Sequence, residues 1–329
     1  MLTETAAPTD LTWSPLDEAA IPAWQRMLAA TERVDRTGEH FSADDLTEEL
    51  ADPTLDVPRR TIALTGPDGE MAAYGIVHVP RTIRECDRVW LEGVVRSDRR
   101  GQGIGRALLT WLEERAVEAH RERFPDVPGE FDVSPFEHVA PHVRLAERAG
   151  YRPARWFTTM RRELSGSGPV PDGVPDGLRL VPFDRAYDDA VRRAHNEAFA
   201  DHWGSSERDA EVWAHWFTGQ RAFRPASSFL VLDGEDVAGY LLSYFWAADA
   251  EATGLREGYV GQLGVRPAWR GRGLGSALLG RALVAYREEG YDRAGLDVDT
   301  ENATGALGLY ARHGFAVTTR RVTYLKPMP

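Results

Sequence analysis

The spacing of hydrophobic positions alternates between two periods along the second half of the chain. Residues 184–199 and 274–289 carry apolar side chains every three or four positions, which predicts two amphipathic helices. A third helix is predicted over 207–216, capped by Ser205 or Ser206, and a fourth over 304–312. Short apolar runs between turn signals predict strands. The predicted strands cover residues 178–181, 229–232, 237–245, 259–265, 294–298 and 315–325.

The first half shows the same order of elements. Its pattern predicts a helix over 17–33, strands over 61–64, 71–79 and 88–95, and a further helix after the last strand. Because strands and helices alternate, the predicted fold class is α/β. We expect two tandem domains, each with a mixed, mostly antiparallel twisted sheet that is flanked by helices.

An internal repeat supports this division. Residues 94–109 match residues 264–279, which follow 170 positions later. Between the copies, residues 165–177 are rich in Gly, Ser and Pro, which is typical of a linker. The sequence therefore predicts an N-terminal domain over 1–168 and a C-terminal domain over 169–329.

The clearest chemical signal is the pattern Arg-x-x-Gly-x-Gly, which occurs in both copies where a strand gives way to a helix. Its residues are Arg100, Gly103 and Gly105, and then Arg270, Gly273 and Gly275. Glycines let backbone N–H groups approach an oxyanion without obstruction by Cβ, and the helix start adds free amides and a positive dipole end. The pattern predicts a cradle for a diphosphate group.

Two rival phosphate-binding motifs fail on their spacing. A P-loop needs Gly-Lys followed by Ser or Thr, and the single lysine of the chain is Lys326. A dinucleotide-binding fingerprint needs Gly-x-Gly-x-x-Gly, whereas the glycines here alternate at 101, 103 and 105 and at 271, 273 and 275.

These residues resemble the GCN5-related N-acetyltransferase (GNAT) family, and the resemblance covers essentially the whole chain. It includes the strand end before each loop and the later series Asn302, Ala306, Tyr310 and Gly314. The resemblance implies acetyl-CoA as cofactor, with its pyrophosphate on the loop and its pantetheine arm along the strand. The residues implied for this site are Leu263, Gly264, Val265, Arg270, Gly271, Arg272, Gly273, Leu274, Gly275, Ser276 and Asn302, and in the first copy Val94, Val95, Arg100, Gly101, Gln102, Gly103, Ile104, Gly105 and Arg106.

The two copies differ at one chemical position. Tyr310 matches a family tyrosine near the thioester sulfur, which implies a general acid for the departing thiolate, whereas the first copy has Ala146 there. The resemblance thus implies a catalytic C-terminal domain and a degenerate, structural or CoA-binding N-terminal domain. The chain shows no Ser-His-Asp grouping at a nucleophile elbow, so direct attack of an amine on the thioester is favoured.

The general base is less defined by the sequence. Glu257 leads into the strand before the second loop, and its position alternates in phase with that strand. Asp297, Asp299 and Glu301 are the other candidates, and Glu257 is favoured among them.

The acceptor side is expected after the first helix of the second half. Asn196, Glu197, His202 and Trp203 lie in one short polar and aromatic stretch, which suits a cationic small-molecule amine. Among two-domain members of the family, the layout is similar to that of the mycothiol synthases, which implies an aminoglycoside-type amine. Position 259 is Tyr259 where that resemblance calls for an acid, and its expected substrate-contacting lysine has no counterpart.

Composition narrows the possible partners. The net charge of −12 and a pI near 5.3 disfavour nucleic acid as ligand. The single cysteine excludes a cysteine-based metal cluster within one chain, and no metal site is predicted. No apolar run of ~18 residues indicates a membrane span, and the acidic, polar start lacks a secretory signal. We expect a cytoplasmic monomer or homodimer.

Two alternatives stay open at this point. The degenerate first copy also fits a non-catalytic acyl-CoA sensor or scaffold. The glycines along residues 258–264 also suggest room for acyl groups longer than acetyl.

Overall fold

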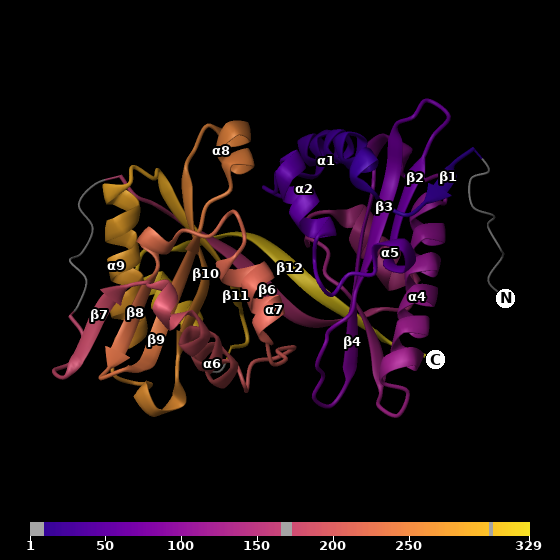
Figure 1. Cartoon of the computed structure of the whole chain (residues 1–329). Helices are drawn as coiled ribbons and strands as arrows, with labels where there is room; N and C mark the ends of the chain where they lie inside the picture. Colours follow the sequence, from indigo (N-terminus) through magenta and orange to yellow (C-terminus); the bar gives the residue numbers. More distant parts are fainter. Residues whose placement is uncertain (1–9, 166–172, 303–304) are drawn as a thin grey trace. The chain divides into compact units, whose positions relative to one another are not determined.

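The computed structural model describes residues 10–165, 173–302 and 305–329, and these residues form two compact units (Figure 1). The N-terminal unit comprises Met1–Arg155 together with Arg321–Pro329, and the C-terminal unit comprises Trp156–Arg320. Both are α/β units with a mixed sheet, as the sequence predicts. The predicted boundary at residue 168 lies outside the described residues.

The N-terminal unit is built on a sheet with the order β1-β2-β3-β4-β5-β12. Among the strand pairs of its described residues, only β4 with β5 is parallel, and the others are antiparallel. One hydrophobic cluster packs α4 against one face, and a second cluster packs α1 against the other. The elements of this half are β1 Thr12–Ser14, α1 Ile21–Asp35, α2 Ala43–Leu50, α3 Val57–Arg60, β2 Thr61–Thr65, β3 Met71–His78, β4 Asp87–Val95, α4 Ile104–Arg123, β5 Gly129–Val133 and α5 Ala140–Arg148.

The C-terminal unit repeats this arrangement with the strand order β12-β6-β11-β10-β9-β8-β7. Among the strand pairs that the described residues of this unit form, only β10 with β11 is parallel. Separate clusters pack α9 and α6 against the sheet. The elements are β6 Arg152–Glu163, β7 Leu178–Pro182, α6 Asp188–Ala198, α7 Ala210–Trp213, β8 Phe229–Asp233, β9 Asp236–Tyr244, α8 Ala247–Thr253, β10 Glu257–Val265, α9 Leu274–Glu288, β11 Arg293–Asp299, α10 Ala306–Arg312 and β12 Ala316–Pro327.

The two halves of the sequence exchange their last strands. β6 comes from the first half, yet most of it pairs antiparallel with β11 inside the C-terminal unit. β12 is the last strand of the chain, and its final residues pair with β5 inside the N-terminal unit. Each unit is therefore completed by a segment from the other half of the sequence.

The predicted helix over 207–216 is shorter and differently capped in the structure. The carboxylate of Asp209 accepts hydrogen bonds from the N–H groups of Glu211 and Val212, so α7 begins at Ala210 and neither predicted serine caps it. A π-helical turn, Ala214–Thr218, then ends the segment. The fourth predicted helix begins at Ala306, and residue 304 lies outside the described residues.

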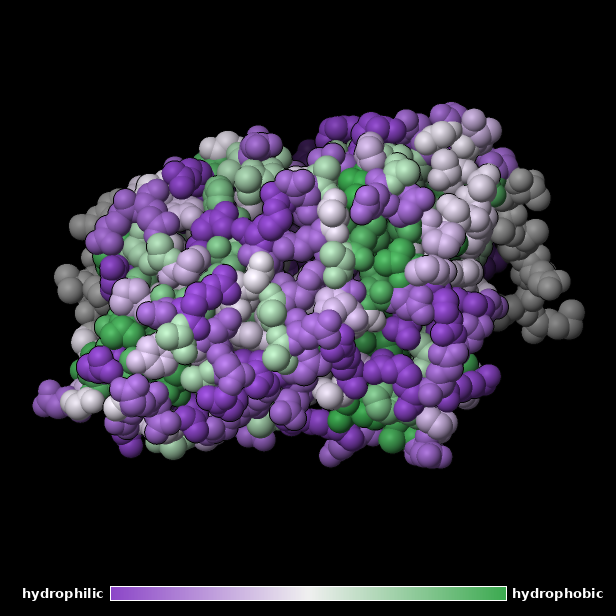
Figure 2. All heavy atoms as spheres, viewed as in Figure 1, coloured by the Kyte–Doolittle hydropathy of each residue, from purple (hydrophilic) through white to green (hydrophobic). Residues whose placement is uncertain are grey.

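Hydrophilic side chains cover most of the face shown in Figure 2, which agrees with the high content of charged residues. Among the described helices, none is both long and apolar enough to cross a membrane.

Candidate active site

Each unit has a glycine-rich loop that leads into a helix. In the C-terminal unit, Gly271 and Gly273 have φ values of 75° and 78°, in the left-handed region that favours glycine. Gly273 is the N-cap of α9, and the first N–H groups of a helix have no acceptor within it. Gly101 and Gly103 have φ values of 79° and 85° before α4. Both loops thus fit an oxyanion at a helix start.

The arginine of each motif braces its loop. Arg270 donates to the carbonyl oxygens of Val265, at 3.2 Å, and of Ala198, at 2.8 Å, and so ties the loop to the end of α6. Arg100 donates to the corresponding strand carbonyl and forms a bidentate ion pair with Asp35, the last residue of α1. These contacts support a bracing role, and direct contact with a pyrophosphate stays a prediction.

The parallel strands in each unit part beside the loop. β10 pairs with β11 from Glu257 to Val260, and within the described part of the chain its remaining paired residues pair with β9 alone. β4 pairs with β5 from Asp87 to Trp90 and then continues beside β3. The predicted cofactor residues 263–265 and 94–95 lie on the parted ends. The fold therefore leaves a strand edge beside each cradle where an extended ligand can lie.

Only the C-terminal unit has a β-bulge on this strand in the described pairings. Val260 pairs with Ser243 and Gln262 pairs with Leu242, so Gly261 is the extra residue. The pairing of β4 with β3 is continuous. A bulge leaves the extra residue outside the regular ladder and re-aims the strand locally, so we expect the N–H of Gly261 to face a group beside the strand.

The glycines of β10 make room for tyrosine rings. A Cβ placed at each of these positions would overlap a ring, so the side-chain space is already filled. The pairs are Gly258 with Tyr286, Gly261 with Tyr244 and Gly264 with Tyr240. This packing removes the reason for expecting space for longer acyl groups along residues 258–264.

Tyr310 is held close to the start of the cradle helix. Its neighbour Leu309 lies against Gly275, where a Cβ would come 3.4 Å from the Leu309 Cδ2 atom. The Tyr310 ring is 8% exposed and packs near Phe315, with ring centroids 6.1 Å apart. Burial raises the pKa of Tyr310 to about 12, so the hydroxyl keeps its proton at neutral pH.

Two further predicted cofactor residues, Ser276 and Asn302, have local contacts in the structure. The Oγ of Ser276 lies 2.8 Å from the Nε2 of His313, which joins the first turn of α9 to the end of α10. Asn302 follows β11, where its N–H donates to the carbonyl of Asp299. The structure thus ties Ser276 to the end of α10, while a ligand contact for Ser276 and for Asn302 stays a prediction.

Glu257 lies at the start of β10 in a cluster of ion pairs. Its carboxylate contacts the Nε of Arg161 at 2.7 Å and also forms an ion pair with Arg293. The three residues come from three adjacent strands, β10, β6 and β11. These contacts support a role in positioning the strands, and the role of Glu257 as a base stays a prediction.

The predicted acceptor residues do not all point the same way. Both polar atoms of the Asn196 amide bond to the backbone of Arg208, which closes the loop after α6. Glu197 pairs with Arg266 at 2.7 Å, at the entrance to the cradle loop. The Nδ1 of His202 lies 3.2 Å from the backbone oxygen of Trp203. Asn196 therefore has a structural role, and a substrate contact from the other three stays a prediction.

His195 and Tyr240 are two buried side chains whose role the sequence pattern does not predict. The Nδ1 of His195 lies 2.7 Å from the hydroxyl of Tyr240, whose ring covers Gly264. Burial, together with the nearby Arg208, lowers the pKa of His195 to about 3, so the imidazole is neutral. This contact supports the parted end of β10 from the α6 side.

A family model described as the acetyltransferase (GNAT) family matches residues 22–127 and 189–315. The chain belongs to the acetyltransferase (GNAT) family. It is accordingly an acetyl-CoA-dependent N-acetyltransferase with two GNAT domains in tandem, and the predicted family and fold are confirmed. Members of this family use acyl-CoA.

Relatives and solved structures match the GNAT chain over nearly its full length. The mycothiol acetyltransferase of Geodermatophilus obscurus is 31% identical over 327 residues, which cover 94% of this chain and 95% of the relative. That of Salinispora arenicola is 34% identical over 299 residues, with 87% and 89% covered. A GCN5-related N-acetyltransferase from Sphaerobacter thermophilus has a TM-score of 0.77 at 28% identity and covers 98% of this chain and 97% of its own.

A second solved structure agrees with the GNAT chain in fold. The tandem GNAT protein from the clavulanic acid biosynthesis pathway has a TM-score of 0.74 at 16% identity, with 97% of this chain and 99% of that chain covered.

Proposed function

We propose that the C-terminal unit transfers the acetyl group of acetyl-CoA to a primary amine of a small molecule by direct attack. The observation that carries this proposal is the presence of both the bulge at Gly261 and Tyr310 in one unit. The N-terminal unit has a regular β4 and Ala146 at the matching places. It has the cradle but lacks both features on which the chemistry depends.

Each step of the proposed reaction has a group in the C-terminal unit. Bound acetyl-CoA supplies the acetyl group. Peptide N–H groups of residues 271–276 hold its pyrophosphate, and the N–H of Gly261 stabilises the carbonyl oxygen as the amine attacks. The Tyr310 hydroxyl donates its proton to the sulfur as the C–S bond breaks, and the proton that the attacking nitrogen then loses returns to the Tyr310 oxygen, so that the amide and the free thiol of CoA are released. The proton that the ammonium loses before attack goes to a base, for which Glu257 stays our prediction.

The acceptor is proposed to enter beside the loop after α6. Arg266 and Arg270 tie the end of α6 to the cradle loop, so this segment is held next to the donor. Relatives named mycothiol acetyltransferases make the deacetylated form of mycothiol the first amine to test. A cationic amino-sugar acceptor also suits the polar and aromatic residues of this segment.

The test pairs equivalent glycines of the two cradles. Acetyl-CoA is incubated with deacetylated mycothiol or glucosamine, and the product is detected by its mass, because a thiol-release assay is confounded by an acceptor that has its own thiol. A Cβ on the left-handed backbone of Gly273 costs roughly 1–2 kcal/mol and obstructs the cradle. We expect Gly273→Ala to raise the KM for acetyl-CoA about tenfold or more.

The matched variant Gly103→Ala makes the same change in the N-terminal cradle, where φ is 85°. We expect it to leave the turnover of the chain within about twofold. Loss of turnover in Gly103→Ala with normal turnover in Gly273→Ala would assign the reaction to the other unit.

A further inference from the structure

The side chain of His313 links the helix of Tyr310 to the helix of the C-terminal cradle. Tyr310 lies on α10, and His313 follows α10 directly as its C-cap residue. The Nε2 of His313 lies 2.8 Å from the Oγ of Ser276, which belongs to the first turn of α9. Both side chains are half-buried. The link therefore joins the end of α10 to the turn that follows the glycine-rich loop.

Two other contacts hold α10 in this place. Leu309 lies against Gly275 in the same turn of α9. Arg162, on the neighbouring strand β6, donates a hydrogen bond to the carbonyl oxygen of His313. Tyr310 stands between Leu309 and His313 in the sequence, so α10 contacts the first turn of α9 on both sides of the tyrosine.

The packing of leucine on glycine occurs in both units and so belongs to the fold. In the N-terminal unit, a Cβ at Gly105 would come 3.2 Å from the Leu145 Cδ2 atom. This contact repeats that of Gly275 with Leu309. The N-terminal unit forms it although Ala146 follows the leucine there. The leucine contact is therefore not specific to the unit in which we propose catalysis.

The side-chain link, in contrast, has no equivalent beside the first cradle. The N-terminal residue that matches His313 is Ala149, which has no polar side-chain atom. The two helix ends nevertheless close in the same way. The N–H of Ala149 donates to the carbonyl oxygen of Ala146 at 3.1 Å, and the N–H of His313 donates to that of Tyr310 at 3.0 Å. Because the helix end forms without a histidine, closing it does not explain the imidazole.

We propose that His313 is a positioning residue, which sets the place of the Tyr310 hydroxyl relative to the acetyl-CoA cradle through its contact with Ser276. This inference rests on the proposed function, in which Tyr310 is the proton donor. The pyrophosphate of the donor is held at the start of α9, so the approach of the hydroxyl to the sulfur depends on how α10 is held against α9. A proton donor has to lie within hydrogen-bond reach of its target, and a misplacement of about 1 Å lowers a rate by about 10²-fold.

The test uses the full chain and saturating acetyl-CoA. It measures kcat by the mass of the product with an accepted amine, or by hydrolysis of acetyl-CoA where water is the acceptor, and calorimetry gives the Kd for acetyl-CoA. We expect His313→Ala to lower kcat about tenfold or more, with a Kd within about twofold of the parent. His313→Gln should restore most of the kcat, because its amide reaches the place of Nε2 and can donate or accept. His313→Asn should not, since its amide ends one methylene short.

The decisive comparison is made in the Tyr310→Phe background. Without the hydroxyl there is no proton donor to position, so adding His313→Ala should lower kcat by less than about twofold. Ser276→Ala combined with His313→Ala should lower kcat about as much as His313→Ala alone, because both changes remove the same contact.

The control is Arg312→Ala, which changes an exposed residue on the last turn of α10 and should retain the parent kcat. Thermal unfolding of each variant shows whether the unit is folded. A parent-like kcat in His313→Ala, or the same loss with and without the Tyr310 hydroxyl, would overturn this inference and leave the general acid in place. A parent-like kcat in Tyr310→Phe would overturn the proposed acid and this inference with it.

Discussion

Replacing Tyr310 by phenylalanine removes one oxygen atom from a ring that is 8% exposed and otherwise keeps its packing against Phe315. The free energy of unfolding should change by about 1 kcal/mol or less, since only the hydroxyl is lost. The loss of a positioned proton donor lowers a rate by about 10²–10⁴. That range corresponds to about 3–5 kcal/mol of transition-state stabilisation, well above the structural effect.

The measurement separates chemistry from binding. Steady-state kinetics with saturating acceptor give kcat, and calorimetry gives the Kd for acetyl-CoA. We expect Tyr310→Phe to lower kcat about 100-fold or more with a Kd within about twofold of the parent. Tyr291→Phe makes the same chemical change within the same core cluster and should retain kcat. An unchanged kcat in Tyr310→Phe, or equal losses in the two variants, would refute the general-acid assignment.

Three further outcomes follow from the described contacts. Because burial and Glu92 raise the pKa of Glu49 from 4.5 to about 8, the folded chain binds a proton that the unfolded chain releases. Stability then falls as the pH rises from 4.5 to about 8, and Glu49→Gln should flatten this fall in a series of Tm measurements. Asn196→Ala removes two bonds to the backbone of Arg208 and should cost about 1–3 kcal/mol in chemical unfolding while it raises the KM of the acceptor. Gly261→Ala forces a methyl group into a tyrosine ring, and kinetics should show a loss of kcat together with a lower Tm.

Local sequence signals predict the elements that surround the cradle well. The strand predicted over 259–265 is β10, Glu257–Val265, and the helix predicted over 274–289 is α9, Leu274–Glu288. The glycines at 271 and 273 adopt the left-handed backbone that the predicted anion cradle requires. These features depend on neighbouring residues and on one amphipathic face, so the pattern alone is sufficient.

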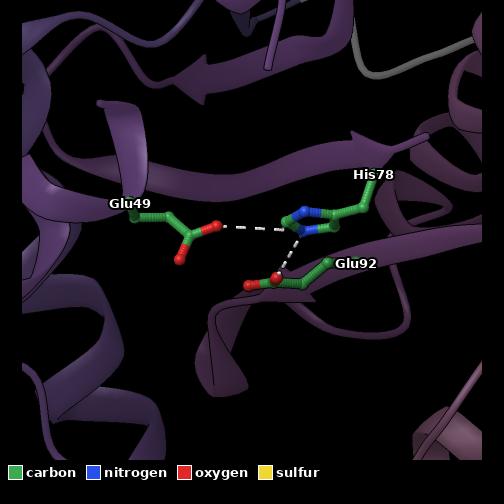
Figure 3. Close-up of side chains that lie close together, drawn as sticks. All are labelled: Glu49, His78 and Glu92. Atoms are coloured by element: carbon green, nitrogen blue, oxygen red, sulfur yellow. Dashed lines mark hydrogen bonds and ion pairs between the residues drawn. The ribbon is translucent and has the colours of Figure 1, made fainter. Parts of the chain in front are cut away.

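Features that depend on residues far apart in the sequence could not be predicted from that pattern. The bulge at Gly261 is defined by its register with β9, and the brace made by Arg270 depends on the carbonyl of Ala198, 72 positions away. The cluster of Glu49, His78 and Glu92 in the N-terminal unit (Figure 3) joins a helix and two strands, and the sequence around Glu49 resembles that of an ordinary surface helix. The capping of α7 shows the same limit on a small scale, since Ser205 and Ser206 were the predicted caps and Asp209, a few residues later, is the one used.

The exchanged strands have a consequence for folding during synthesis. The segment that β5 needs as its partner, Tyr324–Pro327, is synthesised after all the other described strands, so the N-terminal unit has an open sheet edge until then. The C-terminal unit is different, because β6, which it needs as a partner for β11, is synthesised before the rest of that unit. We therefore expect the C-terminal unit to complete its sheet first and the N-terminal unit to complete its sheet last, although the N-terminal unit is synthesised first.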